Sequence, residues 1–167
     1  LFGRPTTVSL SSTLRQNTEG EANSEDRLSP VAVMGSIDVF AEGSTTPDAL
    51  IQWPRQSSFV KTLLTAMEGE FTYQASLTLP QVEETSPGPL DPNGGVVNRL
   101  LIQTDLIGTT MALPQPFAKT ADSAMPFELT LKLGETDQQV SGSLGEQLVF
   151  DFALKEEVID NGVVYIG

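Results

Sequence analysis

The chain has 167 residues, enough for one domain and marginal for two, and 39% of them are apolar, which suffices for a folded core. Asp and Glu number 22 against 9 Lys and Arg, so the net charge is −13. Nucleic-acid binders gain affinity by neutralising phosphates with cations, so this charge argues against a DNA or RNA partner and against electrostatic docking on anionic lipid. No run approaches the roughly 18 apolar residues that a membrane-spanning helix requires.

Histidine and cysteine are both absent from the sequence. The chain therefore has no imidazole for a Ser-His-Asp triad or an HExxH zinc site, and no thiol nucleophile, disulfide or cysteine-ligated metal. We expect no catalytic residue, no cofactor and no metal site, and we do not expect an enzyme. The chain begins at Leu1 without a basic-then-apolar leader, so we interpret residues 1–167 as a single β-rich domain cut from a longer protein.

The residue pattern in the first part of the chain predicts two strands separated by a loop. A strand is predicted over Thr6–Ser12, and clear alternation of apolar and polar residues predicts a second over Val31–Val39. Asn17–Asp26 between them is polar and acidic and has nothing to bury. We therefore predict an exposed loop over residues 17–26.

Residues 47–67 break this alternation. Their apolar residues recur at three- and four-residue intervals, which predicts a short helix over Pro47–Gln52 and a longer amphipathic helix over Gln56–Met67. Trp53-Pro54 predicts the break between the two helices. Trp53 could form a ligand shelf, but a tryptophan beside a proline at a helix break more often closes the end of a core.

The rest of the chain returns to strands. The clearest alternation predicts strands over Phe71–Leu79, Phe127–Leu133 and Leu148–Leu154, and further strands are predicted over Asn98–Thr104, Thr109–Leu113, Gln138–Ser143 and Val163–Ile166. Pro80–Gly95 is rich in proline and glycine, so we predict a loop over residues 80–95. Strands with one apolar face are typical of antiparallel sheets. The predicted fold is mainly β (α+β minor), a twisted antiparallel sheet suited to a slice of an open β groove, with one short helical region packed on its apolar face.

Two kinds of acidic motif could form chemical sites. The pairs Glu83-Glu84 and Glu156-Glu157 could act as general acid and base, but adjacent residues of an extended chain point to opposite sides, which favours solvated charge. Asp91–Gly95 has the oxygen-rich composition of a calcium loop. Position 12 of an EF-hand loop would be Ile102, however, so an ordinary turn is favoured.

The motifs over Arg99–Leu133 follow an order that is known from one family. A strand ends in TDLIG (residues 104–108), LPQPFAK follows (residues 113–119), and Pro126-Phe127 opens the next strand. Phe59–Pro80 matches the family's helix followed by a strand G-x-x-x-Y-x-x-x-L-x-L-P, and Gly162–Gly167 matches a recurring strand that closes on glycine. In these motifs the chain resembles the large YhdP-type proteins of Gram-negative bacteria, members of the AsmA-like group that includes TamB.

This resemblance implies a periplasmic segment of a protein that an N-terminal helix, outside this sequence, anchors in the inner membrane. Proteins of the group are thought to form a long β groove lined with apolar side chains, along which phospholipid moves between the inner and outer membranes and supports the outer-membrane barrier. The resemblance therefore implies a non-enzymatic function. It also implies two kinds of partner, phospholipid acyl chains and neighbouring β segments of the same full-length chain.

The candidate lipid-facing residues come from two of the predicted strands. They are Phe127, Leu129, Leu131, Leu133, Leu148, Phe150, Phe152 and Leu154. Any one of them could instead belong to a core beneath the predicted helix Gln56–Met67, and the sequence favours the core. The alternative function is an extracellular or surface β module that acts as a structural spacer or adhesion domain, since the acidic charge and the many Thr and Ser residues fit it equally well.

Overall fold

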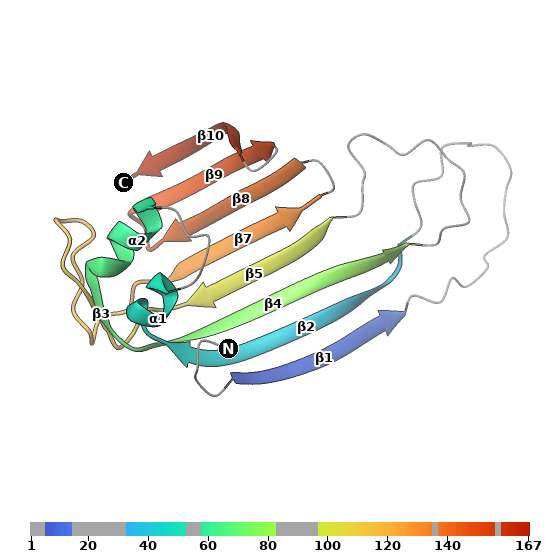
Figure 1. Cartoon of the computed structure of the whole chain (residues 1–167), viewed down its shortest axis with the longest axis horizontal. Coiled ribbons are helices and arrows are strands. Elements are labelled where there is room, and N and C mark those ends of the chain that lie inside the picture. Colours follow the sequence, from blue (N-terminus) through green and yellow to red (C-terminus); the bar gives the residue numbers. More distant parts are fainter. Residues whose placement is uncertain (1–5, 15–32, 53–57, 83–96, 135–136, 156–157) are drawn as a thin grey trace, which may run out of the picture.

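The computed structural model describes residues 6–14, 33–52, 58–82, 97–134, 137–155 and 158–167 (Figure 1). The main sheet contains β1 (Thr6–Leu14), β2 (Val33–Thr45), β4 (Phe71–Val82), β5 (Asn98–Thr104), β7 (Phe127–Leu133), β8 (Asp137–Leu144), β9 (Leu148–Lys155) and β10 (Val158–Ile166). The other elements are α1 (Pro47–Ile51), α2 (Ser58–Thr65), β3 (Met67–Gly69) and β6 (Thr109–Met111).

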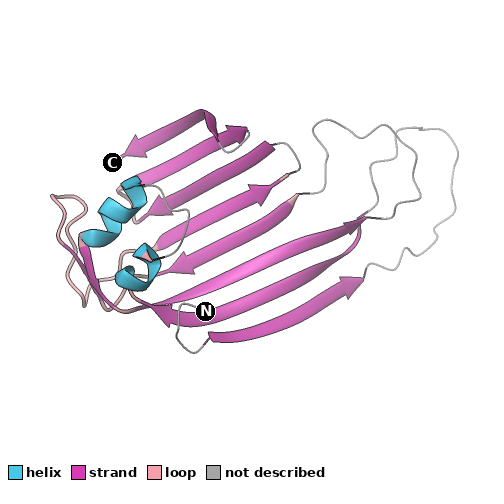
Figure 2. Cartoon of the chain, viewed as in Figure 1, coloured by secondary structure: helices cyan, strands magenta, loops and turns pink. Residues whose placement is uncertain are grey.

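The eight strands of the main sheet lie in the order β1-β2-β4-β5-β7-β8-β9-β10, and every neighbouring pair is antiparallel. β1 and β10 form its two edges, and β3 pairs with β6 in a separate two-stranded sheet. The predicted mainly β fold, an open antiparallel sheet with a minor helical part, is confirmed (Figure 2).

The strand register gives this sheet one apolar face. Two rows of residues cross all eight strands on it, and we call them the central rows. The first central row is Val8, Ala41, Ala75, Ile102, Leu129, Gly142, Phe150 and Val164, and the second is Leu10, Val39, Leu77, Leu100, Leu131, Val140, Phe152 and Gly162. Neither central row contains a charged residue. The opposite face, which we call the polar face, carries Asp38, Glu42, Arg99, Glu128, Lys132, Asp151 and Lys155.

Only one end of the apolar face is covered by described helices and loops. A buried cluster there contains Phe71, Leu106, Met111 and Met125. Leu50 of α1 packs against this cluster, as do Phe127 and Leu144 of the main sheet, while α1 and α2 contact each other and β3 (Figure 2). We call this region the capped end. The expected helical region therefore lies on the apolar side of the sheet, but at its end, and neither described helix is long and apolar enough to cross a membrane.

Several predicted boundaries differ from the structure. The helix over Gln56–Met67 was predicted too long at its C-terminal end, because α2 ends at Thr65 and the backbone of Met67 pairs with Met111 in β3–β6. The strand over Thr109–Leu113 ends at Met111. Strands β2 and β10 are longer than predicted, since β2 continues to Thr45 and β10 begins at Val158.

The predicted loop over residues 80–95 is wrong at its start. β4 continues through Pro80 to Val82, and Pro80 is in register with Ser36 of β2. The neighbour on the other side, β5, is in register with β4 only over residues 74–78, so the missing proline N–H removes no ladder bond there. Several other predicted features lie outside the described residues. They are the remainder of the loop over residues 80–95, the loop over residues 17–26, Trp53, the pairs Glu83-Glu84 and Glu156-Glu157, and Asp91–Gly95.

Candidate functional site

The structure brings the eight candidate residues together on the apolar face. Four come from β7 and four from β9, and β8 lies between the two strands. The register places Leu129 level with Phe150, and Leu131 level with Phe152, across the intervening strand. All eight side chains are half-buried.

The eight residues are not equivalent. Phe127 lies at the capped end, where it packs against the buried cluster together with Leu144. Phe127 is therefore a core residue. Leu129, Leu131, Phe150 and Phe152 lie in the central rows, away from that cluster.

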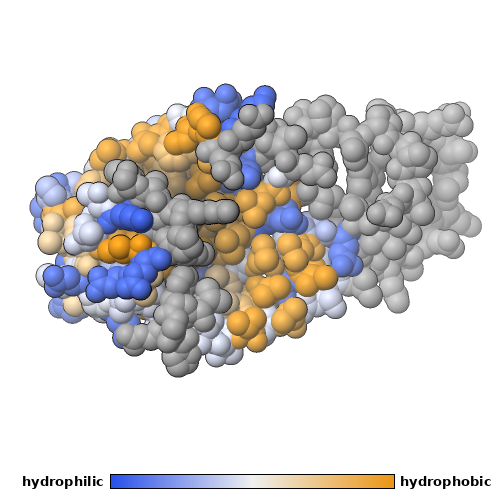
Figure 3. All heavy atoms as spheres, in the orientation of Figure 1, coloured by the Kyte–Doolittle hydropathy of each residue, from blue (hydrophilic) through white to orange (hydrophobic). Residues whose placement is uncertain are grey.

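No residue of either central row is fully buried. Val8, Leu10 and Val164 on the two edge strands are exposed, and the interior positions of both rows are half-buried. Figure 3 shows apolar side chains gathered on this face beside the helices. This arrangement provides a wide apolar surface that the described helices do not cover.

Two aromatic rings stand out within this surface. The rings of Phe150 and Phe152 on β9 are stacked, with centroids 5.6 Å apart and an angle of 26° between their planes. Both side chains are half-buried. An uncharged surface with stacked aromatic rings can make dispersion contacts and exclude water, and it contains no group that could transfer a proton.

The sequence analysis did not include the apolar residues of neighbouring strands that extend this surface. Val140 of β8 lies between Leu131 and Phe152, and Leu100 of β5 lies on the other side of Leu131. The alternation over Gln138–Ser143 and Asn98–Thr104 was the sequence feature that could have identified Val140 and Leu100. It was weak because β8 has few large apolar residues.

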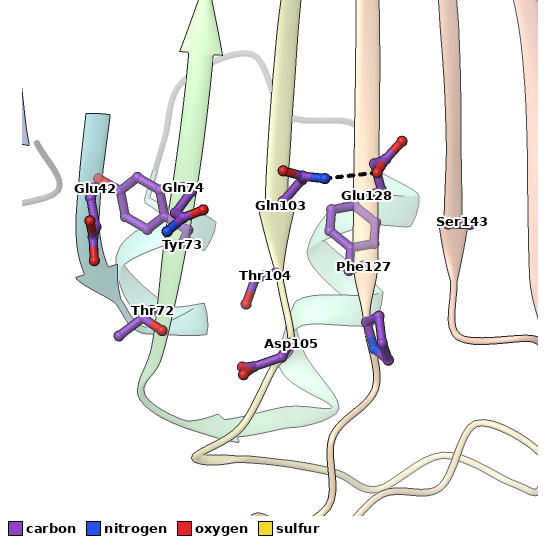
Figure 4. A pocket seen from close by; sticks show the side chains of 11 residues that line it. Glu42, Thr72, Tyr73, Gln74, Gln103, Thr104, Asp105, Phe127, Glu128 and Ser143 are labelled. Atoms are coloured by element: carbon purple, nitrogen blue, oxygen red, sulfur yellow. Dashed lines mark hydrogen bonds between the residues drawn. The ribbon is translucent and has the colours of Figure 1, made fainter. Parts of the chain in front are cut away.

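The polar face holds a shallow depression of about 410 Å³ (Figure 4). Glu42, Gln74, Gln103 and Glu128 line it from four adjacent strands, and they form one row across the sheet. Gln103 Nε2 donates a hydrogen bond of 2.9 Å to Glu128 Oε2. All four side chains are exposed, so this row is a solvated polar surface. In the described part of the chain, no three acidic side chains gather closely enough to hold a metal ion.

Lys119 is the buried charged residue of the capped end. Its Nζ donates hydrogen bonds to the backbone oxygens of Thr109, at 2.9 Å, and Thr120, at 3.0 Å. Burial lowers the pKa of this ammonium below its ordinary value, and the negative charges of Asp105 and Asp122 oppose that shift. Lys119 therefore joins two backbone segments of the capped end.

No protein-family model, curated protein or solved structure matches this chain. The resemblance to the AsmA-like group consequently stays a prediction.

Proposed function

We propose that this chain is a non-enzymatic segment of a protein that carries phospholipid between the inner and outer membranes, with acyl chains lying on the apolar face. The observation that supports it is the separation of charge across the sheet. The central rows contain no charged residue and no fully buried residue, whereas charged residues gather on the polar face.

The energetics favour a hydrocarbon ligand on this face. Burying apolar surface contributes about 25 cal/mol per Å², or about 0.8 kcal/mol for each methylene group. A half-buried leucine or phenylalanine retains part of that free energy for a ligand. A charged or hydrogen-bonding ligand would gain little, because the side chains of the central rows supply neither opposite charges nor polar partners.

The dimensions also suit an acyl chain. Neighbouring strands lie about 4.8 Å apart, so eight strands span about 34 Å. The hydrocarbon core of a bilayer is about 30 Å thick and accommodates two acyl chains end to end. A chain lying across the strands could therefore remain on apolar side chains along its whole length.

In this proposal the two edges of the sheet pair with neighbouring β segments of the same full-length protein. β1 contains no charged residue, and every residue of β10 is exposed, including Val158, Tyr165 and Ile166. Edge strands that face water usually carry charges or prolines that prevent pairing. The scarcity of such residues here supports covered edges, and the periplasm is the proposed location.

The direct test is photo-crosslinking in Gram-negative membranes. A crosslinking residue at Leu129 or Phe150 should capture phospholipid, because both positions lie in the first central row. The matched control is Glu128, which is adjacent to Leu129, exposed and on the polar face, and which should capture none. Equal capture at Glu128 and Leu129, or none at Leu129 and Phe150, would contradict the proposal.

The alternative is a surface β module that acts as a spacer or in adhesion. The row of carboxylates and amides on the polar face would then form its contact surface. Native mass spectrometry of the purified chain distinguishes the two functions. Bound phospholipid is expected for a carrier segment, and a ligand-free chain is expected for a spacer.

A further inference from the structure

Each central row contains one glycine that lies beside a phenylalanine. Gly142 is in register with Phe150, and Gly162 is in register with Phe152. A Cβ added to Gly142 would come within 2.6 Å of Phe150 Cζ, and one added to Gly162 within 2.2 Å of Phe152 Cδ1. Each ring therefore occupies the space that a side chain on the glycine would need, so it lies over the neighbouring strand.

The two rings lie over opposite neighbours. Phe150 covers Gly142 on β8, and Phe152 covers Gly162 on β10, so the stacked pair on β9 covers parts of three strands. We call these four residues the aromatic floor. Glycine is what allows the rings to lie low, because any side chain at either position would push the ring upward.

The same glycines allow close approach of neighbouring backbones. A Cβ at Gly142 would lie 2.5 Å from the backbone oxygen of Glu128, and a Cβ at Gly162 would lie 2.9 Å from that of Asp151. Both positions therefore require glycine, because a side chain there would collide with the neighbouring backbone as well as with the ring.

We infer that the aromatic floor is the place where a phospholipid acyl chain makes its closest contact, and that Gly142 and Gly162 shape that contact. This inference rests on the proposed function and adds the residues that determine the form of the binding surface. Rings that occupy the space over Gly142 and Gly162 leave the surface above them open, and they can make dispersion contacts with a hydrocarbon chain that lies there.

Other occupants of the floor are less favoured. An extended peptide would bring backbone N–H and C=O groups to a surface of Phe, Val, Leu and Gly that offers them no side-chain partner. A second copy of this chain would bring another net charge of −13, and like charges of that size disfavour association. A neutral hydrocarbon chain meets neither difficulty.

The inference is tested with a photo-crosslinker at Leu131, which is level with Phe152 across β8. The probe is a vesicle of phosphatidylethanolamine and phosphatidylglycerol. Gly162→Val should lower phospholipid capture about fivefold, as expected for losing one favourable aromatic contact. The control is Asn161→Val, which introduces the same side chain at the adjacent position, on the polar face of β10.

A second variant keeps the test decisive if Gly162→Val does not fold by circular dichroism. Phe152→Leu retains an apolar side chain at the same position and removes the ring, so it should also lower capture several-fold. If the unaltered chain captures phospholipid and the folded variants capture as much, the inference is wrong and the proposed function stands. If the unaltered chain captures no phospholipid, or crosslinks only to protein, the proposed function fails as well.

Discussion

The capped end and the central rows belong to one sheet, yet they bury their apolar side chains to different extents. Phe71 and Met111 at the capped end are each 7% exposed, whereas Leu131 and Phe150 in the central rows are half-buried. The strands alternate in the same way in both regions. The difference comes from α1, β3, β6 and the loop that contains Leu106, which cover one end only. Stability is therefore expected to depend on the capped end, and ligand binding on the central rows.

The largest expected effect is a loss of stability from a substitution at the capped end. Phe71→Ala should lower the free energy of unfolding by about 3–5 kcal/mol, because it leaves a cavity in the buried cluster. Phe150→Ala should cost about 1–2 kcal/mol, since that side chain already contacts solvent. Urea denaturation measures both. Equal losses would mean that the central rows are core.

The next effect concerns ligand binding in the central rows. Leu131→Asp should lower phospholipid capture by a crosslinker at Leu129 about 100-fold, because a charged Asp amid hydrocarbon costs about 2.5–3.5 kcal/mol. Lys132→Asp introduces the same residue at the adjacent position, which is exposed on the polar face, and should leave capture nearly unchanged. Both variants need a thermal melt first, and a folded Leu131→Asp chain with normal capture would count against a lipid path.

A smaller effect is expected at Lys119 in the capped end. Lys119→Met removes two hydrogen bonds to backbone oxygens and should destabilise the chain by about 1–3 kcal/mol. The control Lys61→Met, at an exposed position of α2, should change stability by less than about 0.5 kcal/mol. Thermal unfolding of the two variants compares them directly.

The pH dependence of stability gives a second test of the contribution of Lys119. Because burial lowers the pKa of Lys119 in the folded chain below 10.5, the unfolded chain binds more protons in the pH range just below that value. The contribution of Lys119 to stability should therefore increase as pH rises through that range. The difference in unfolding free energy between the unaltered chain and Lys119→Met should widen accordingly. A narrowing difference would indicate that Asp105 and Asp122 outweigh burial.

The smallest expected effect is on the polar face. Gln103→Ala removes an exposed hydrogen bond to Glu128 and should change the unfolding free energy by less than about 0.5 kcal/mol. Phospholipid capture at Leu129 should be unaffected. A clear loss of capture would favour a ligand on the polar face and hence the spacer or adhesion function.

The strands could be predicted where alternation is strict. β7 has the predicted bounds, because large apolar residues recur at every second position until the strand ends. β5 also has the predicted bounds, although its apolar residues Leu100, Leu101 and Ile102 are consecutive. β10 was recognised only in its second half, since Asp160, Asn161 and Gly162 are typical of a turn. In the structure its register shifts between Ile159 and Asn161, and pairing with β9 continues beyond the shift. Pairing between strands thus outweighs local preference, and the local sequence cannot show this.

The candidate site could be predicted in part, because alternation within a strand is visible in the sequence but the register between strands is not. The residues on β7 and β9 follow from alternation, which also indicates that they share a face. Their alignment across β8, and the contacts of Gly142 and Gly162 with the rings, depend on the register between strands. A shift of one residue would move every side chain to the other face. These contacts therefore required the structure.

The direction of the central rows has a consequence for movement along them. The rows run across the strands, so a hydrocarbon chain sliding along a row would pass a new backbone about every 4.8 Å. The resistance it meets would vary with the height of each side chain. The first central row contains Ala41, Ala75 and Gly142, while the second has a branched or aromatic side chain at every position before Gly162. Side-chain height therefore varies less along the second row, which makes the second row the smoother track.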